Sequence, residues 1–192
     1  ENEIAKTTLF KVLTGEIIPD SGEIKIGTTV VMSYFPKNHD EYFTGQENLV
    51  EFLRKYSDNK EDSFVRGFLG RMLFSGEETL KSTAVLSGGE KVRLMFSKMM
   101  MKKGNILLLD EPFASIDPTS RKQFIQILAR LHQAGKTILV CDHDFNDYAD
   151  VVDQVVTLKN GQFEKQPLTF IKTKPQTFQL TTSVVKQPML QL

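Results

Sequence analysis

The sequence predicts an α/β fold with a mostly parallel sheet and crossover helices. Short apolar segments of strand length alternate with longer segments that carry helix-capping residues, and this alternation is typical of parallel sheets. The clearest strand is residues 106–109; the clearest helix has Asp117 as its N-cap and Pro118 in its first turn, and ends at Gly135. With 192 residues, the chain is long enough for one domain, or for one domain plus a tail.

The composition is typical of a globular protein in a reducing compartment. Hydrophobic residues make up 40% of the chain and charged residues 25%. Basic and acidic residues both number 24, so the net charge does not point to nucleic acid or to a membrane. Cys141 is the single cysteine, which excludes an internal disulfide, and we interpret it as a core residue of a cytoplasmic protein. No apolar run is long enough to span a bilayer, so no membrane insertion is expected.

The N-terminal part should hold one helix and two strands. We expect the helix at residues 6–13, because Gly15 lies just past an apolar periodic stretch. Turn-forming residues then separate this helix from strands expected at residues 23–26 and 29–35.

The sequence in the middle of the chain predicts three helices. Two of them, at residues 46–56 and 62–74, are expected to form a separate helical lobe. A third, at residues 88–103, is rich in methionine, which suits either core packing or a binding surface, and the helical spacing favours the core. These methionines are Met95, Met99, Met100 and Met101.

The C-terminal part predicts two further strands, at residues 137–141 and 152–158, with a hairpin turn at Asn160-Gly161. The domain is therefore expected to cover residues 1–162. Residues 163–192 contain prolines and no hydrophobic period, so we expect an irregular tail or the start of a further segment.

Leu86-Ser-Gly-Gly-Glu90 is a pattern suited to phosphate binding. Ser87, Gly88 and Gly89 open a helix, so backbone N–H groups can approach phosphate oxygens closely. The helix dipole favours negative charge at the same place.

Asp110 and Glu111 follow the apolar strand at residues 106–109. Ligands of open α/β sheets gather at the carboxyl ends of the strands. One carboxylate can therefore hold Mg²⁺ while the next acts on a water molecule. The alternative interpretation makes the pair a helix N-cap and its neighbour.

Lys6 and Thr7 fit the last two positions of the phosphate-loop pattern G-x-x-x-x-G-K-[ST]. Ala5 stands where a glycine usually precedes the lysine, and the first glycine of the pattern would lie before Glu1. The alternative is a surface Lys-Thr at a helix start. The order and spacing of the downstream motifs favour the phosphate loop.

Together these stretches resemble the Walker A, signature and Walker B motifs of the ABC ATPases, and the resemblance covers residues 1–162. It implies the P-loop NTPase core of the ABC type with a helical subdomain at about 45–103, truncated at the N-terminus. It also implies an enzyme that uses ATP and Mg²⁺ and converts ATP and water to ADP and phosphate.

The resemblance also implies roles for individual residues. Glu111 would be the general base, and His143 would be the switch histidine near the γ-phosphate. Thr7 and Asp110 would hold Mg²⁺. The expected nucleotide contacts, which include a cradle of backbone N–H groups from Ile4 to Thr8, come from Asn2, Ile4, Ala5, Lys6, Thr7, Thr8, Lys37, Ser87, Gly88, Gly89 and Asp117.

In this family the signature loop caps an ATP molecule held by the Walker A motif of a second domain. The resemblance therefore implies a head-to-tail pair of domains, in the same chain or in different chains, and poor turnover by one domain alone. The family's adenine-stacking aromatic residue would lie before Glu1, so we expect weak or absent ATP binding by this stretch alone.

Lys37 departs from the family pattern. The Q-loop usually places a glutamine after the strand, whereas this chain reads Tyr34-Phe-Pro-Lys37. A lysine cannot accept a hydrogen bond from a metal-bound water, but it can contact a phosphate directly.

The subfamily indications differ along the chain. Residues 6–15, 33–43 and 70–75 resemble the second domain of ABC-F proteins, which act on ribosomes and have no membrane domains. Residues 117–121 and 135–140 resemble ATPase subunits of membrane transporters. Three hypotheses follow: an ABC-F ATPase of translation, a transporter ATPase that binds membrane-spanning subunits, or an ATP-dependent interaction module with little turnover.

Overall fold

The computed structural model describes residues 2–114, 116–142, 146–148, 150–159, 161–168 and 179–183. Within these residues the strands form one six-stranded sheet in the order β1-β2-β3-β6-β4-β5. The strands are β1 (Met32–Phe35), β2 (Ile106–Asp110), β3 (Thr137–Asp142), β4 (Val155–Lys159), β5 (Gln162–Gln166) and β6 (Gln179–Ser183).

The sheet is parallel at one side and mixed at the other. β1, β2 and β3 pair in parallel, with Phe35 opposite Leu109 and Asp110 opposite Cys141. β6 pairs antiparallel with both β3 and β4, so β4 runs in the same direction as β3. The crossover connections expected from the alternation of helices and strands are therefore present on the parallel side.

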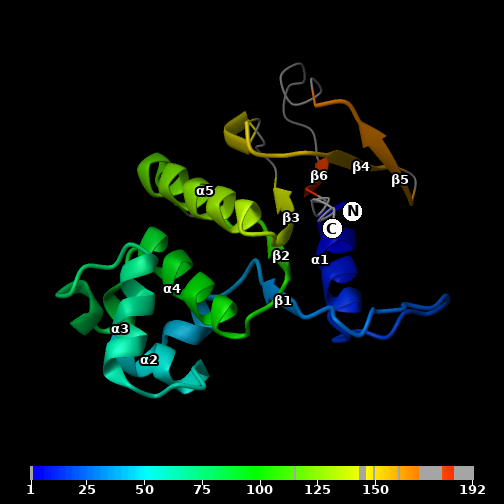
Figure 1. Cartoon of the computed structure of the whole chain (residues 1–192). Helices are drawn as coiled ribbons and strands as arrows, with labels where there is room; N and C mark the ends of the chain where they lie inside the picture. The colour runs from blue at the N-terminus through cyan, green and yellow to red at the C-terminus, as the bar shows by residue number, and fades with distance from the viewer. Residues whose placement is uncertain are drawn as a thin grey trace, which may run out of the picture.

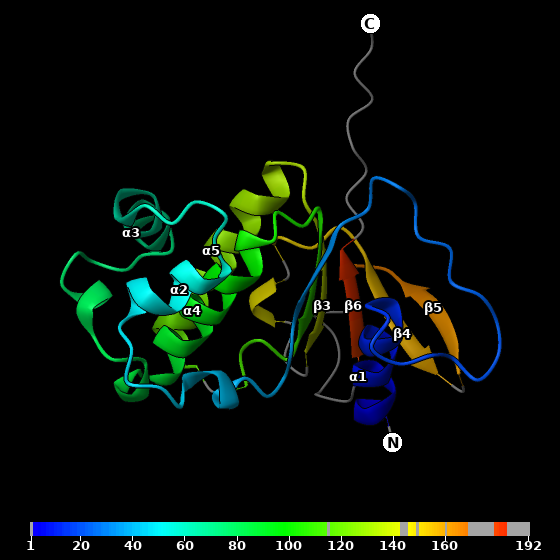
Figure 2. The same ribbon diagram turned by 90° about the horizontal axis from the view of Figure 1, so that it is seen from below.

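Helices cover both faces of the parallel strands. The helices are α1 (Asn2–Leu13), α2 (Leu49–Tyr56), α3 (Asp62–Arg71), α4 (Gly88–Met101) and α5 (Pro118–Gln133). α1 lies on one side of the sheet, and α4 and α5 lie on the other (Figures 1 and 2). α2 and α3 pack against the outer side of α4 and form the helical lobe.

Among the described residues, four short 3-10 helices occur in the connections between these elements. They are η1 (Asp40–Phe43), η2 (Glu78–Leu80), η3 (Thr83–Val85) and η4 (Asn146–Tyr148). η2 and η3 lie in the segment that leads from the helical lobe to α4.

The core divides at β2, because successive side chains of a strand point to opposite faces. Leu107 and Leu109 belong to the main core, which is shared with the helices α2 to α5. Leu108 instead joins Phe10 and Cys141 beneath α1. Cys141 is fully buried, which confirms its interpretation as a core residue. A strand that is buried on both faces is typical of a parallel sheet between helix layers.

Aromatic rings build the centre of the main core. The ring centroids of Phe96 on α4 and Phe124 on α5 lie 4.7 Å apart in an edge-to-face arrangement. Phe113, which follows β2, lies 5.1 Å from Phe124 and 5.3 Å from Tyr148. Such aromatic pairs add to the free energy gained by burying apolar surface. They join α4 and α5 to the loop after β2, where the candidate site begins.

Side-chain caps determine where two of the helices start. Asn48 and Glu51 form a reciprocal capping box at the beginning of α2, and Ser87 and Glu90 form another at the beginning of α4. In each box a side-chain oxygen accepts from the backbone N–H group three residues on, and the Glu carboxylate accepts from the N-cap N–H group. The beginning of α4 is thus encoded within the sequence 87–90.

The expected ends of α5 and of the C-terminal hairpin are confirmed. The Asp117 carboxylate accepts from the backbone N–H groups of Thr119 and Ser120, both at 3.0 Å. Gly135 has a φ of 83° and Gly161 a φ of 75°, which are left-handed conformations that glycine adopts without strain. β4 and β5 pair antiparallel around Gly161.

The helix and strands that the sequence predicts near the N-terminus differ from the structure in two respects. The helix begins at Asn2 and not at Lys6, so the stretch expected to be a phosphate loop continues the helix. Residues 23–26 are not a strand, and the strand expected at 29–35 is reduced to Met32–Phe35. Ile24 and Ile26 are 39% and 50% exposed, so strand propensity alone does not produce a strand without a pairing neighbour.

Two segments within the stretch expected to be an irregular tail or the start of a further segment form strands. β5 extends to Gln166, and β6 lies inside the sheet between β3 and β4. The sequence of β6, Gln-Leu-Thr-Thr-Ser, has no strong hydrophobic period, and its place is determined by pairing with β3. The predicted domain boundary at residue 162 stays a prediction.

Among the helices of the described residues, none combines the length and the apolar character that a bilayer crossing requires.

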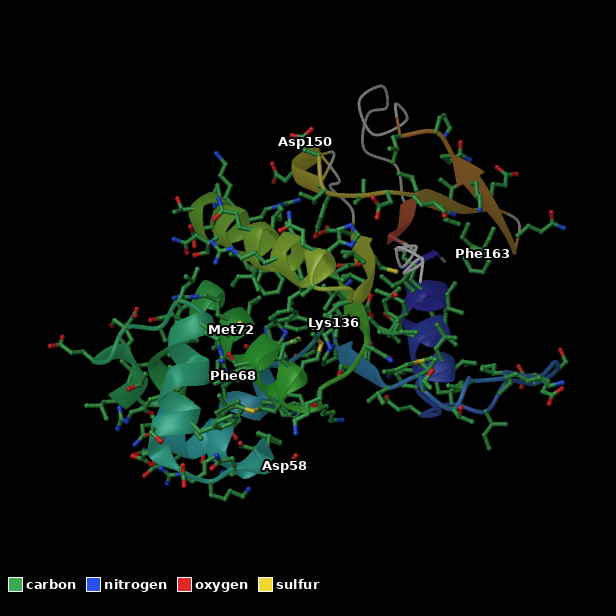
Figure 3. All side chains as sticks on the ribbon, viewed as in Figure 1. Asp58, Phe68, Met72, Lys136, Asp150 and Phe163 are labelled. Atoms are coloured by element: carbon green, nitrogen blue, oxygen red, sulfur yellow. The ribbon has the colours of Figure 1, made fainter. Side chains whose placement is uncertain are left out.

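We expect Phe96→Ala to lower the free energy of unfolding by roughly 3–5 kcal/mol, because it leaves a cavity beside Phe124 in a fully buried position. The matched control is Phe163→Ala on β5, the strand at the edge of the sheet, where the residue is 54% exposed (Figure 3). That control should change stability by less than about 0.5 kcal/mol. Urea unfolding of both variants measures the difference, and equal effects would contradict the core described above.

Candidate functional site

The candidate site lies at the carboxyl ends of the three parallel strands. β1 ends at Phe35, β2 at Asp110 and β3 at Asp142, and all three ends meet at one edge because the strands run in parallel. The N-terminal half of α1 reaches the same edge, as its Thr7 contacts Asp110. This edge is where ligands of open α/β sheets bind.

Asp110 accepts two side-chain hydrogen bonds within the site. The Thr7 hydroxyl donates to its Oδ2 at 2.7 Å, and the Tyr34 hydroxyl donates to the same oxygen at 3.3 Å. The Asp110 side chain is almost fully buried. Burial raises the pKa of Asp110, and the two hydrogen bonds oppose that rise only in part. Burial therefore disfavours the ionised form of Asp110, and a cation bound beside the carboxylate would favour it.

The residues present fit Mg²⁺. Mg²⁺ prefers hard oxygen ligands and usually keeps several waters, so a hydroxyl and one carboxylate are enough protein ligands when a nucleotide supplies the others. Thr7 and Asp110 provide this pair of oxygens in direct contact. No group of three or more His, Cys, Asp or Glu that could hold a metal occurs in the described part of the chain.

Lys6 is a buried cation next to the same strands. It is only 2% exposed. Its charge lowers the pKa of Cys141, although burial and the carboxylate of Asp110 raise that pKa well above its ordinary value. Lys6 therefore lies close to β3, on the side of the sheet that α1 covers.

Glu111 is held by both its backbone and its side chain. Its φ is 45°, a left-handed conformation that is uncommon for a residue other than glycine, and its N–H group donates to the Cys141 carbonyl at 2.8 Å. The Lys37 ammonium lies 3.0 Å from Oε2 of the Glu111 carboxylate, whose side chain is 6% exposed. The residue at the Q-loop position thus contacts the expected general base.

The expected cradle of backbone N–H groups differs from the structure. Because α1 begins at Asn2, the N–H groups of Lys6, Thr7 and Thr8 lie inside the helix and bond to carbonyls four residues earlier. Ile4 is 76% exposed and does not face the site. The side chain of Lys6 is buried and that of Thr7 contacts Asp110, whereas the backbone around them is helical and not the expected loop.

The signature residues form a second group with different contacts. The Ser87 hydroxyl accepts from the N–H group of Glu90, whose carboxylate also lies 2.7 Å from the Lys81 ammonium. A Cβ atom at Gly89 would come within 2.6 Å of Ser120 Oγ on α5. Ser87, Gly88 and Gly89 are therefore placed beside the start of α5, next to Asp117.

Two of the expected site residues cannot be placed. His143 lies outside the described residues, as does the side chain of Asn2, and their roles stay predictions. Ala5 and Thr8 are exposed on α1.

Sequence reasoning missed three residues that shape the site. Tyr34 donates to Asp110, Tyr148 donates to Asp142 Oδ2 at 2.8 Å, and Ser120 lies against Gly89. Their positions depend on how strands and helices are paired. The available sequence signal was weak: Tyr34 lies three residues before the Q-loop position, Lys37.

A groove of about 830 Å³ opens between α1, β1 and α4. Thr7, Tyr34 and Lys37 line its end next to the candidate site. Further along, the Lys98 ammonium lies 3.4 Å from the centroid of the Tyr42 ring. Burial, with the charge of Lys102, lowers the pKa of Lys98 to about 8. The groove therefore extends the site toward the helical lobe.

Gly89→Ala should lower the free energy of unfolding by roughly 1–3 kcal/mol, because the added methyl group overlaps Ser120. The control is Gly67→Ala in α3, where an added Cβ meets nothing within 4 Å. Removing a helical glycine there should raise stability by about 0.5–1 kcal/mol. Thermal unfolding of the two variants compares them, and a neutral Gly89→Ala would show that α4 and α5 are not in such close contact.

Comparison with known proteins identifies the family. The sequence model described as "ABC transporter" matches residues 1–114. The chain is 46% identical over 168 residues to the uncharacterized ABC transporter ATP-binding protein YkpA of Bacillus subtilis, covering 86% of this chain and 31% of YkpA. It is 29% identical to the energy-coupling factor transporter ATP-binding protein EcfA3 of Oenococcus oeni, covering 83% of this chain and 62% of EcfA3. The chain therefore spans less than two thirds of either relative.

The fold agrees with this identification. The dimeric structure of a post-hydrolysis state of the ATP-binding cassette MJ0796, bound to ADP and Pi, superimposes with a TM-score of 0.67. That match covers 83% of this chain and 80% of the other at 17% identity, so it concerns the fold alone. Because the family model matches more than half of the chain and the fold is that of an ATP-binding cassette, this chain belongs to the ABC transporter family and is one of its ATP-binding domains.

Proposed function

We propose that this domain hydrolyses ATP with Mg²⁺ at the edge formed by β1, β2 and β3, as one half of a head-to-tail pair of domains. The observation that carries the proposal is the 2.7 Å contact between the Thr7 hydroxyl and the buried Asp110 carboxylate. This contact joins the expected Walker A and Walker B residues, which lie 103 positions apart in the sequence.

The charges of the site suit a nucleotide triphosphate. Lys6 supplies a buried ammonium group that can bind the β- and γ-phosphates. Thr7 and Asp110 would hold Mg²⁺, which when bound neutralises charge on the phosphate oxygens.

In this proposal, Glu111 acts on the attacking water. Its carboxylate accepts the water proton as the water oxygen forms a bond to the γ-phosphorus. The bond from that phosphorus to the bridging oxygen breaks, and ADP leaves with the electron pair. His143 would assist at the γ-phosphate, as the family resemblance implies. The low exposure of Glu111 favours this role, because excluding water strengthens its interactions with the reacting groups.

The pairing of two domains is supported by the separation of the site residues into two groups. Lys6, Thr7, Asp110 and Glu111 gather at the carboxyl edge of the sheet, while Ser87 to Gly89 gather beside Asp117 at the start of α5. In a head-to-tail pair, the second group of one domain would face the γ-phosphate held by the first group of the other. The fold neighbour bound to ADP and Pi is itself dimeric.

In the full-length protein, Glu111→Gln is expected to reduce the rate of ATP hydrolysis by roughly 100-fold or more while ATP binding is retained, because the amide cannot accept the proton. The matched control is Glu77→Gln, an exposed position, which should leave the rate unchanged. Phosphate release and equilibrium ATP binding measure the two properties. If the wild-type protein binds ATP but releases no phosphate, the domain is instead an interaction module with little turnover.

We further propose that the parent protein is a soluble ABC-F ATPase that acts on the ribosome. The support is the resemblance of residues 6–15, 33–43 and 70–75 to the second domain of ABC-F proteins. The relative YkpA is about three times as long as the matched region, which leaves room for a second such domain.

A transporter ATPase subunit is the second candidate. It is favoured by the resemblance of residues 117–121 and 135–140 to transporter subunits. It is also favoured by the likeness to EcfA3, whose own name describes a transporter ATP-binding protein. Membrane-spanning subunits would then be the partners.

The Glu111→Gln variant separates these two candidates, because it should hold the ATP-bound state. We expect this variant to co-sediment with ribosomes in the presence of ATP and to be released when ADP replaces ATP. The control is the Lys6→Met variant, which should lose ATP binding and with it the ribosome association. Co-purification with a membrane complex, without ribosome binding, would favour the transporter subunit.

A further inference from the structure

Lys37 stands at the Q-loop position, where this family usually has a glutamine. Its ammonium group lies 3.0 Å from Oε2 of Glu111. The Lys37 side chain is 41% exposed and that of Glu111 is 6% exposed, so a half-buried cation reaches a buried carboxylate. The pair joins the loop after β1 to the loop after β2.

The register of the sheet produces this contact. β1 and β2 pair in parallel with Phe35 opposite Leu109. Lys37 lies two residues beyond Phe35, and Glu111 lies two residues beyond Leu109. The two residues therefore occupy equivalent places after neighbouring strands, and a long side chain at position 37 can reach position 111.

The backbone of Glu111 is fixed independently of Lys37. Its left-handed φ and the hydrogen bond from its N–H group to Cys141 hold the main chain. The remaining freedom is in the side-chain torsions, and the ammonium of Lys37 restricts them through Oε2.

The carboxylates of Asp110 and Glu111, which are adjacent in the chain, contact different side chains. Asp110 receives its hydrogen bonds from Thr7 and Tyr34, both on Oδ2. Glu111 lies next to it in the chain but is engaged by Lys37. With separate partners, the two adjacent negative charges can point in different directions and serve different tasks.

We propose that Lys37 is a positioning residue that holds the Glu111 carboxylate in its working orientation and so determines the rate of the chemical step. This inference rests on the proposed function of Glu111. It differs from a direct role of Lys37 on a phosphate, because a phosphate ligand would contribute mainly to ATP affinity.

The test compares Lys37→Met, Lys37→Gln and Lys37→Arg with the control Lys25→Met. Lys25 is a surface lysine whose side chain is 82% exposed. Lys37→Met should lower kcat by roughly 10-fold or more, since misplacing a catalytic group by about 1 Å can cost about 100-fold. KM should change by less than about threefold, because ATP binding does not depend on the pair.

The two conservative variants refine the result. Lys37→Arg keeps a cation and should recover most of the lost kcat, whereas Lys37→Gln keeps only a neutral donor and should recover less. A rise in KM with kcat preserved would overturn the proposal in favour of a phosphate contact. An unchanged kcat in Lys37→Met would also overturn it.

A second measurement does not depend on ATP hydrolysis. The change in Tm caused by Glu111→Gln should differ between the wild-type and Lys37→Met backgrounds, because the two side chains interact. It should be the same in the wild-type and Lys25→Met backgrounds. Additive Tm changes in the Lys37→Met background would overturn the proposal. If the wild-type protein shows no turnover, the proposed function fails, and this comparison still decides whether Lys37 holds Glu111.

Discussion

The parallel register of β1, β2 and β3 is the constraint on which the site depends. It brings the residues that follow three strands to one edge, although they lie far apart in the chain. Burial of both faces of these strands favours the register, because a shift by one residue would turn Leu108 away from Phe10. Thr7 then meets Asp110 because α1 packs on the same strand. The chemistry of the domain follows from this packing arrangement.

Elements with local end signals could be predicted from the sequence. α5 has its Asp117 cap and Gly135, and α4 begins where Ser87 and Glu90 form a capping box. Elements that depend on a distant partner could not. Residues 23–26 have strand-forming side chains but no neighbouring strand, and β6 is a strand because β3 offers its free edge. Local patterns therefore predicted the two ends of α5 and the beginning of α4, whereas the beginning of α1 and the pairing of β6 were missed.

For the candidate site, too, the sequence indicated individual residues but not the contacts between distant segments. Motif spacing pointed to Thr7, Asp110 and Glu111, and the structure brings Thr7 and Asp110 into contact. The partner of Glu111 could not be predicted, because the contact with Lys37 requires knowledge of which strands are neighbours and in what register. The conformation around Lys6 was also missed, since a continuous helix and a loop before a helix have similar local sequences.

The close approach of Gly89 to Ser120 has a mechanical consequence. With no space between the beginnings of α4 and α5, neither helix can shift there without displacing the other. Ser87 and Asp117 cap these two helices, so a displacement of one cap toward this contact would press on the other helix. A tilt of the helical lobe, which packs against α4, would be transmitted to both caps together. A movement of the lobe would therefore change the geometry of any interface that contains these two caps.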